Sequence, residues 1–327
     1  MNRSPRLALM TLPSLDHFVS DVVDRLPAAA GIEVRQFRYA GPETMATALA
    51  WAGNPATDMV WFEFCWPPFP AVIEATDFGG RRVIVRIHRV EATETSHVAT
   101  APWGKIDDAI VVSEDMKRRV LKQAPEIAFT TRLHLVPNGV DTERFRPAAS
   151  PDPKRIGWAG LMTLRKNPAL ALQVLMNLHR IDPEYRLHMC SMQVEPFAME
   201  TFWYQVKMFG LENAIVWDGH VPQSEMPDWH RQNMALLHTS LHESFGYVIA
   251  EAALCGCRVA VLDFPGARTI WPEAILYRSV DEAATILTAA DQTVLRDHVL
   301  RCYGTAHFLD AMKGVLRSSV REDMIVG

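Results

Sequence analysis

Short apolar runs alternate along this chain with longer stretches in which apolar residues recur every three to four positions. Apolar runs of about four to eight residues bounded by turn residues predict buried strands, and the longer periodic stretches predict helices. This alternation is typical of a parallel sheet covered by helices, an α/β fold. The predicted strands are 7–12, 32–37, 58–64, 81–88, 109–114 and 132–137 in the first half, and 155–160, 185–191, 214–221, 234–240 and 258–263 in the second.

Between Pro137 and Pro147 the alternation breaks into a segment dense in turn residues and proline. Such a segment predicts a domain boundary. We therefore expect one Rossmann-like domain over 1–147 and a second over 148–302, with a last helix over about 303–327 that can return to the first domain. Two such domains joined by a short linker would face each other across a cleft. Open parallel sheets bind ligands beyond the carboxyl ends of their strands, so we expect the ligand in that cleft.

Composition narrows the class of protein. The 327 residues are 49% apolar, and 33 basic against 38 acidic residues give a net charge of −5, so we expect no nucleic-acid partner. No apolar run approaches the ~18 residues of a membrane span, and the run at 7–12 is too short for a signal peptide. Peripheral membrane association stays open. Five cysteines without a paired C-x-x-C pattern favour a reducing, cytoplasmic setting.

The most informative segment holds two carboxylates, Glu243 and Glu251. Glu243 follows an apolar run and stands in a loop, whereas Glu251 falls inside the next apolar-periodic stretch, which indicates a strand, a short loop and a helix. A helix start offers unpaired backbone N–H groups and a partial positive charge, so it can bind a diphosphate without a metal. Glu251 lies about one turn into that helix, roughly 6–8 Å along its axis. Two acceptors at that separation can hold two parts of one elongated, hydroxyl-rich ligand.

This segment resembles the E-x7-E signature of the family 4 retaining glycosyltransferases, which have the two-domain GT-B fold. Their pattern is S-x-x-E-x-F-G-x-x-x-x-E-A, and the matching residues here are Ser240, Glu243, Phe245, Gly246, Glu251 and Ala252. The resemblance implies that Glu243 contacts the transferred sugar and that Glu251 holds the ribose of the nucleotide. It also implies that the amides of Phe245, Gly246 and Tyr247 hold sugar hydroxyls and phosphate. The segment 136–147, VPNGVDTERFRP, is similar to the linker between the two domains of that family.

Arg165 and Lys166 stand beside a predicted helix start at Asn167-Pro168. Two cations there form a candidate diphosphate clamp, since Arg offers a forked donor set and Lys a mobile charge. The alternative is an exposed basic pair. The family pattern is G-R-L-x-x-x-K-G, and Lys166 matches its Lys, whereas Leu161 stands where the family has Arg. Either Arg165 supplies the missing guanidinium, or phosphate binding is weaker than is usual in the family.

In the first half, His88 directly follows a predicted strand and opens an H-R-x-E pattern with Arg89 and Glu91. A lone His in this place is often structural, but the resemblance implies a His that faces the donor sugar. Arg89, Glu91 and Glu63 are candidate cleft residues, with a buried, paired carboxylate as the alternative for Glu63. The first loop lacks the glycines common in the family, so Asp16 is either an acceptor contact or a solvated cap residue.

The resemblance implies a metal-independent, cofactor-free retaining transferase that moves a hexose-type sugar from a nucleoside diphosphate sugar. The acceptor is a hydroxyl of a glycan, a lipid-linked compound or a small molecule, in glycan or polysaccharide biosynthesis. In that reading 1–147 is the acceptor side, 148–302 binds the donor, and His88, Glu243 and Lys166 are catalytic. The alternative is a nucleotide-sugar-binding GT-B protein with little or no transferase activity. A paired-carboxylate hydrolase is disfavoured, because Glu251 stands on a helix behind the loop. His238 and His242 have i, i+4 spacing, but their segment indicates a strand and loop, which disfavours a zinc pair.

Overall fold

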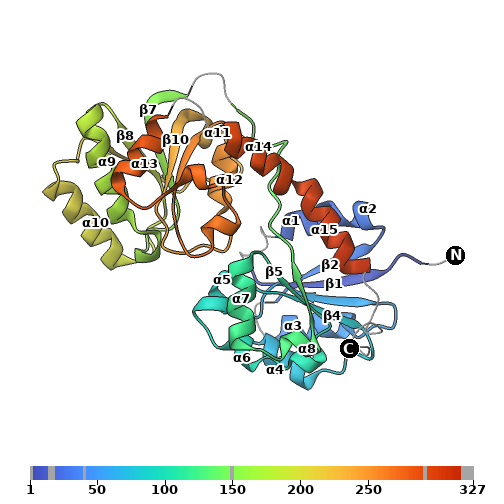
Figure 1. Cartoon of the computed structure of the whole chain (residues 1–327). Coiled ribbons are helices and arrows are strands. Elements are labelled where there is room, and N and C mark those ends of the chain that lie inside the picture. The colour runs from blue at the N-terminus through green and yellow to red at the C-terminus, as the bar shows by residue number, and fades with distance from the viewer. Residues whose placement is uncertain (1–2, 14–18, 40–41, 148–150, 290–292, 318–327) are drawn as a thin grey trace. The chain divides into compact units, whose positions relative to one another are not determined.

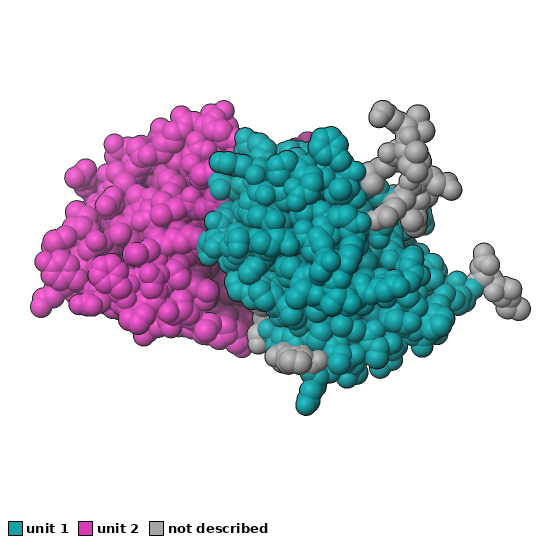
Figure 2. Space-filling model, turned by 90° about the horizontal axis from the view of Figure 1, so that it is seen from below, with its two compact units in different colours: residues 1–139, 305–327 teal, residues 140–304 magenta. Residues whose placement is uncertain are grey.

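The computed structural model describes residues 3–13, 19–39, 42–147, 151–289 and 293–317. The chain forms two compact units (Figure 2). Unit 1 holds residues 1–139 and 305–327, and unit 2 holds residues 140–304. Among the described residues, no helix combines the length and the apolar character that crossing a bilayer requires.

Unit 1 is built on a six-stranded parallel sheet in the order β2-β1-β3-β4-β5-β6 (Figure 1). The central strands β3 and β4 are buried along their whole length, as expected when helices cover both faces of a sheet. The strands are β1 (Arg6–Thr11), β2 (Glu33–Arg38), β3 (Met59–Phe62), β4 (Arg82–Arg86), β5 (Asp108–Val111) and β6 (Arg132–Leu135). The helices are α1 (Ser20–Asp24), α2 (Leu26–Ala30), α3 (Pro42–Ala52), α4 (Phe69–Ala75), α5 (Arg89–Thr93), α6 (His97–Thr100), α7 (Glu114–Gln123), α8 (Ile127–Thr130) and α15 (Thr305–Arg317).

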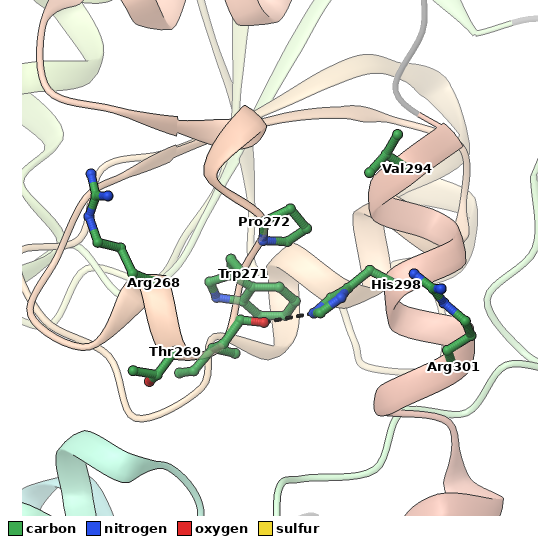
Figure 3. A pocket seen from close by; sticks show the side chains of 8 residues that line it. Arg268, Thr269, Trp271, Pro272, Val294, His298 and Arg301 are labelled. Atoms are coloured by element: carbon green, nitrogen blue, oxygen red, sulfur yellow. Dashed lines mark hydrogen bonds between the residues drawn. The ribbon is translucent and has the colours of Figure 1, made fainter.

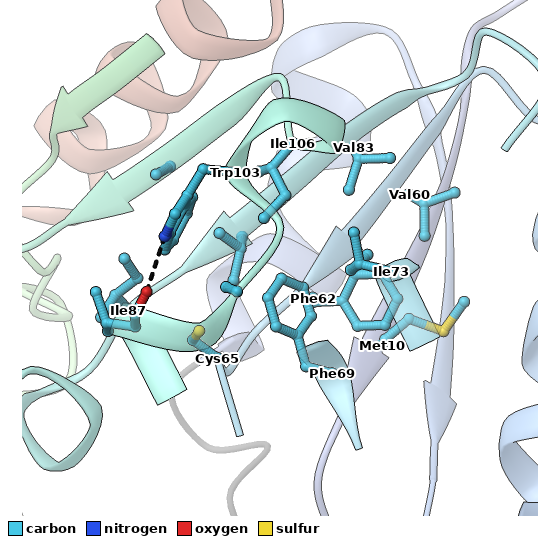
Figure 4. Close-up of a cluster of buried hydrophobic side chains, with 14 of the residues drawn as sticks. Met10, Val60, Phe62, Cys65, Phe69, Ile73, Val83, Ile87, Trp103 and Ile106 are labelled. Atoms are coloured by element: carbon cyan, nitrogen blue, oxygen red, sulfur yellow. Dashed lines mark hydrogen bonds between the residues drawn. The ribbon is translucent and has the colours of Figure 1, made fainter. Parts of the chain in front are cut away.

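Two apolar clusters hold unit 1 together. In the first, Met10 and Phe62 from the sheet pack with Phe69 of α4, and Trp103 packs near them with its Nε1 donating to a backbone carbonyl (Figure 4). The second cluster includes Leu7 and Leu9 of β1. Three residues of α15 belong to it: Phe308, Met312 and Val315. The last helix of the chain is therefore part of the core of unit 1.

Unit 2 repeats the architecture, with a parallel sheet in the order β12-β11-β10-β7-β8-β9. Its strands are β7 (Asp152–Ala159), β8 (Arg186–Cys190), β9 (Ile215–Gly219), β10 (Asn233–His238), β11 (Arg258–Leu262) and β12 (Leu276–Tyr277). Its helices are α9 (Pro168–Ile181), α10 (Pro196–Met208), α11 (Met226–Gln232), α12 (Tyr247–Leu254), α13 (Val280–Thr288) and α14 (Thr293–Cys302).

The expected α/β architecture with two parallel sheets is confirmed, and each predicted strand is present. The sequence pattern missed β12, because a strand of two residues is too short to show any periodicity.

Candidate functional site

Two loops of unit 2 meet at the carboxyl edge of its sheet. Strands β7 and β10 are parallel neighbours, so the loops that follow them leave the sheet at the same edge. The first loop carries Arg165 and Lys166 in a short 3₁₀ helix, Leu164–Lys166. The second donates to the first twice, from Thr239 Oγ1 to Lys166 O at 2.6 Å and from Leu241 N to Arg165 O at 2.9 Å. These bonds hold the basic pair against the loop that carries Glu243.

Glu243 is the centre of a charged cluster. Its Oε1 accepts from Lys166 Nζ at 2.5 Å and from Arg165 Nη1 at 3.1 Å, and the same Arg165 nitrogen donates to His242 O at 3.0 Å. Burial favours a raised pKa for Glu243, but the charge of Lys166, with His238 and Arg165, holds that pKa well below its ordinary value. The carboxylate is therefore ionised, and it forms ion pairs with both cations in the free protein.

The expected clamp residues, Arg165 and Lys166, are thus brought together. Leu161 has an apolar side chain, so it contributes no polar group to this cluster. The Leu161 side chain lies 44% exposed. Arg165, by contrast, places a guanidinium nitrogen on the carboxylate that Lys166 also contacts. Arg165 is therefore placed where a guanidinium and the Lys166 ammonium lie on one carboxylate.

Gly246 directly precedes helix α12 as its N-cap and has a conformation that other residues rarely adopt, with φ of +92°. A Cβ on Gly246 would lie 2.8 Å from Ile249 Cδ1, so a side chain here would also require the end of the Ile249 side chain to move. The neighbouring Phe245 ring is buried against Trp271 and Tyr303. Phe245 can therefore offer a ligand only its backbone, which agrees with the expectation that backbone amides act in this loop.

Glu251 lies in the middle of α12 in a different environment. Its Oε1 accepts from Gln223 Nε2 at 3.1 Å, and its Oε2 lies 3.7 Å from His230 Nε2. His230 is fully buried, and neither of its ring nitrogens has a hydrogen-bond partner among the described residues. The carboxylate of Glu251 thus has an uncharged amide as its donor.

In unit 1, His88 is fixed at the end of β4 by two carboxylates. Its Nε2 lies 2.9 Å from Glu63 Oε1, and its backbone N–H donates to Glu91 Oε2 at 2.7 Å in a capping box at the start of α5. The ring stacks on Phe64 with a centroid separation of 4.4 Å and an interplanar angle of 25°. Packing and hydrogen bonding therefore fix the orientation of the His88 imidazole.

The other candidates of unit 1 have structural partners. Glu63 is buried and also accepts from Arg86 Nη1 at 3.1 Å, which matches the alternative of a buried, paired carboxylate. Glu91 is fully buried, and this burial raises its pKa. Arg89 pairs with Glu94. Asp16 lies outside the described residues.

Sequence reasoning missed the two buried imidazoles, His230 and His238, and the amide of Gln223. One sequence feature could have pointed to His238, namely its position just before the loop that carries Glu243. His230 and Gln223 had none, because α11 and the loop before it are brought to Glu251 only by the packing of α11 on α12. Among the described residues, no three His, Cys, Asp or Glu side chains are grouped so that they could hold a metal ion.

A shallow cavity of about 310 Å³ lies between the 3₁₀ helix Ala267–Thr269 and α14 (Figure 3). Arg268, Trp271, His298 and Arg301 are among its lining residues, and His298 Nε2 lies 2.8 Å from Ile270 O. None of the predicted site residues lines this cavity.

Comparison with known proteins identifies the relatives of this chain. Residues 140–275 match the family model described as glycosyl transferases group 1. The D-inositol 3-phosphate glycosyltransferase of Xylanimonas cellulosilytica is 29% identical over 194 residues, 52% of this chain and 46% of that protein. The mannosylfructose-phosphate synthase of Agrobacterium fabrum is 26% identical over 145 residues, 39% of this chain and 32% of that protein. The aligned stretch thus spans less than half the length of each of these curated relatives.

Solved structures share the fold over 96% of this chain. Anabaena HepE in complex with UDP and glucose has a TM-score of 0.75 at 15% identity, covering 96% of this chain and 100% of the other. The sucrose-phosphate synthase of Thermosynechococcus elongatus has a TM-score of 0.72 at 15% identity, covering 96% and 98%. The predicted GT-B fold is confirmed by this likeness and by the two parallel sheets.

Proposed function

We propose that this chain is a member of the group 1 glycosyl transferases and that it moves a hexose-type sugar from a nucleoside diphosphate sugar to a hydroxyl acceptor with retention of configuration. The observation that carries the proposal is the cluster of Lys166 and Arg165 on Glu243 Oε1 at the carboxyl edge of the sheet of unit 2. Such an edge is where open α/β sheets bind their ligands. The acceptor class extends to glycans, lipid-linked compounds and small molecules, and the proposed setting is cytoplasmic glycan or polysaccharide biosynthesis.

The cluster suits the chemistry of diphosphate departure. As the bond from the anomeric carbon to the diphosphate oxygen breaks, negative charge grows on the phosphate and positive charge on the sugar. Lys166, Arg165 and the amides at the start of α12 would stabilise the phosphate, an electrostatic task of the oxyanion-hole kind. The ionised Glu243 would stabilise the sugar. The acceptor hydroxyl bonds to the anomeric carbon from the leaving-group side and gives its proton to a phosphate oxygen, so the step requires no protein nucleophile.

Glu251 would hold the ribose of the same donor. A carboxylate accepts hydrogen bonds from two vicinal hydroxyls, and Gln223, which donates to Glu251 Oε1, would keep it oriented. His88 would act from unit 1, where Glu63 and the capping box fix its ring.

A donor panel tests the proposal directly. The full-length protein is mixed with UDP-, GDP- and ADP-sugars, and thermal shift is followed by assays of transfer to acceptor extracts. We expect one nucleotide class to raise the melting temperature and to support transfer. Binding without transfer or donor hydrolysis would favour the alternative, a nucleotide-sugar-binding protein without transferase activity. No binding of any donor would overturn the proposal.

We also propose that transfer needs no metal ion, because Lys166, Arg165 and the helix start already supply positive charge at the diphosphate. Activity is expected to survive EDTA. Loss of activity that manganese restores would contradict this proposal.

A further inference from the structure

His238 is a buried histidine directly beside the charged cluster. It is the last residue of β10 and is only 3% exposed. Neither ring nitrogen has a hydrogen-bond partner among the described residues. Its Nε2 lies 3.8 Å from Glu243 Oε1, just beyond hydrogen-bond distance. A buried polar group without a partner is costly, so a position this close to a carboxylate calls for an explanation.

The charged groups that face His238 come from two loops. Glu243 approaches from the loop after β10, and Lys166 and Arg165 approach from the 3₁₀ helix after β7. Two uncharged side chains are also neighbours: the Phe264 ring, whose centroid lies 5.8 Å from that of His238, and Tyr277, whose hydroxyl donates to His238 O at 3.1 Å.

These surroundings keep the imidazole neutral in the free protein. Burial lowers the pKa of His238, the Glu243 carboxylate opposes that effect, and the positive charges of Lys166 and Arg165 lower the pKa further. The two cations thus act against protonation of His238 while they remain on Glu243.

A bound diphosphate changes this balance. It carries negative charge and draws the two cations toward its own oxygens, away from Glu243 Oε1. The carboxylate then lacks its ion partners, and the imidazole nearest to it is His238. We propose that His238 takes up a proton when a nucleoside diphosphate binds, and that it then donates a hydrogen bond to Glu243 and holds that carboxylate toward the sugar. His238 is thus a positioning residue, and this inference rests on the proposed function.

Proton uptake can be counted by calorimetry. UDP, GDP and ADP are titrated into the full-length protein at pH 7.5 in buffers of different ionisation enthalpy. The slope of observed binding enthalpy against buffer ionisation enthalpy equals the number of protons taken from the buffer. We expect a positive slope for the wild-type protein and a lower slope for His238→Phe. The nucleotide's own titration contributes equally to both proteins, so the difference between slopes reports His238.

Further variants keep the test decisive if His238→Phe fails to fold. Glu243→Gln retains His238 but removes the negative charge that attracts the proton, so its slope is expected to fall as well. His179→Gln is the matched control, because His179 lies in α9 of the same unit and bonds to Tyr185 O at 3.0 Å outside the cluster. Its slope is expected to equal that of the wild-type protein.

The outcomes separate this inference from the proposed function. Nucleotide binding with a slope that neither His238→Phe nor Glu243→Gln changes overturns the inference and leaves the proposed function intact. No binding of any of the three nucleotides overturns both. A lower slope in both variants, with nucleotide affinity that strengthens as the pH falls only in proteins that retain both groups, supports the inference.

Discussion

Glu243 faces two cations, whereas Glu251, eight positions further along the chain, faces the neutral amide of Gln223. Each carboxylate also has a buried imidazole nearby, His238 at 3.8 Å from Glu243 and His230 at 3.7 Å from Glu251. One motif has therefore produced two different electrostatic sites. The site of Glu243 holds ion pairs whose cations could pair with a diphosphate instead. The site of Glu251 suits uncharged hydroxyls.

This difference changes what a mutation at each position should do. A negative carboxylate that occupies Lys166 and Arg165 competes with a diphosphate for the same cations. A carboxylate held by a neutral amide does not compete with phosphate at all. Loss of Glu243 should therefore lower sugar transfer without weakening the binding of free nucleotide, whereas loss of Glu251 should weaken the binding of both the donor and the free nucleotide.

The largest effect is expected for Glu243→Gln on transfer. We expect the turnover rate to fall by at least about 100-fold, the usual scale for losing one group that stabilises transition-state charge. Affinity for the free nucleoside diphosphate should stay equal or become tighter, because Lys166 and Arg165 are released. Transfer kinetics and calorimetry on the same preparation measure both quantities. Weaker binding of the free nucleotide would show that the assigned role of Glu243 is wrong.

Glu251→Ala should weaken the donor and the free nucleotide together. Losing hydrogen bonds from ribose to a charged group costs about 1.5–3 kcal/mol, roughly a 10- to 150-fold loss of affinity for either ligand. The exposed Glu212→Ala serves as the control variant. A change confined to the sugar-bearing donor would contradict the assignment to ribose.

Lys166→Ala should weaken nucleoside diphosphate binding by about 1–3 kcal/mol through loss of a charge-assisted hydrogen bond. Part of that loss is offset, because the free protein also loses its Lys166–Glu243 ion pair. Arg165→Ala should weaken binding by a similar amount if Arg165 replaces the guanidinium absent at Leu161. Unchanged affinity in both variants would place the diphosphate elsewhere.

His88→Ala should lower turnover by at least about tenfold, ~1.4 kcal/mol of barrier, with little change in nucleotide affinity. Glu63→Gln keeps the buried shape but weakens the hold on His88 Nε2, so we expect a smaller loss in the same direction. Thermal unfolding measured in parallel checks the outcome. A loss of activity that is matched in each variant by a large drop in melting temperature would mean that His88 has only a structural role.

The sequence alone determined the two α/β halves, the positions of the strands other than β12, and the strand, loop and helix that carry Glu243 and Glu251. These features depend on residues close together in the chain, where apolar periodicity and the demand for glycine at Gly246 act locally. The same local information left open whether Glu63 and Glu91 are buried, because the sequence around a carboxylate does not show which residues from elsewhere in the chain will cover it.

Only the tertiary structure decided which groups meet. Lys166 and Arg165 reach Glu243 across 77 and 78 residues, because β7 and β10 are neighbours in the sheet and their loops leave at one edge. His238 lies behind Glu243, and His230 and Gln223 meet Glu251, for the same reason of strand order and helix packing. Charge and burial at a site depend on neighbours in space, so the difference between the two motif carboxylates could arise only when the chain folded.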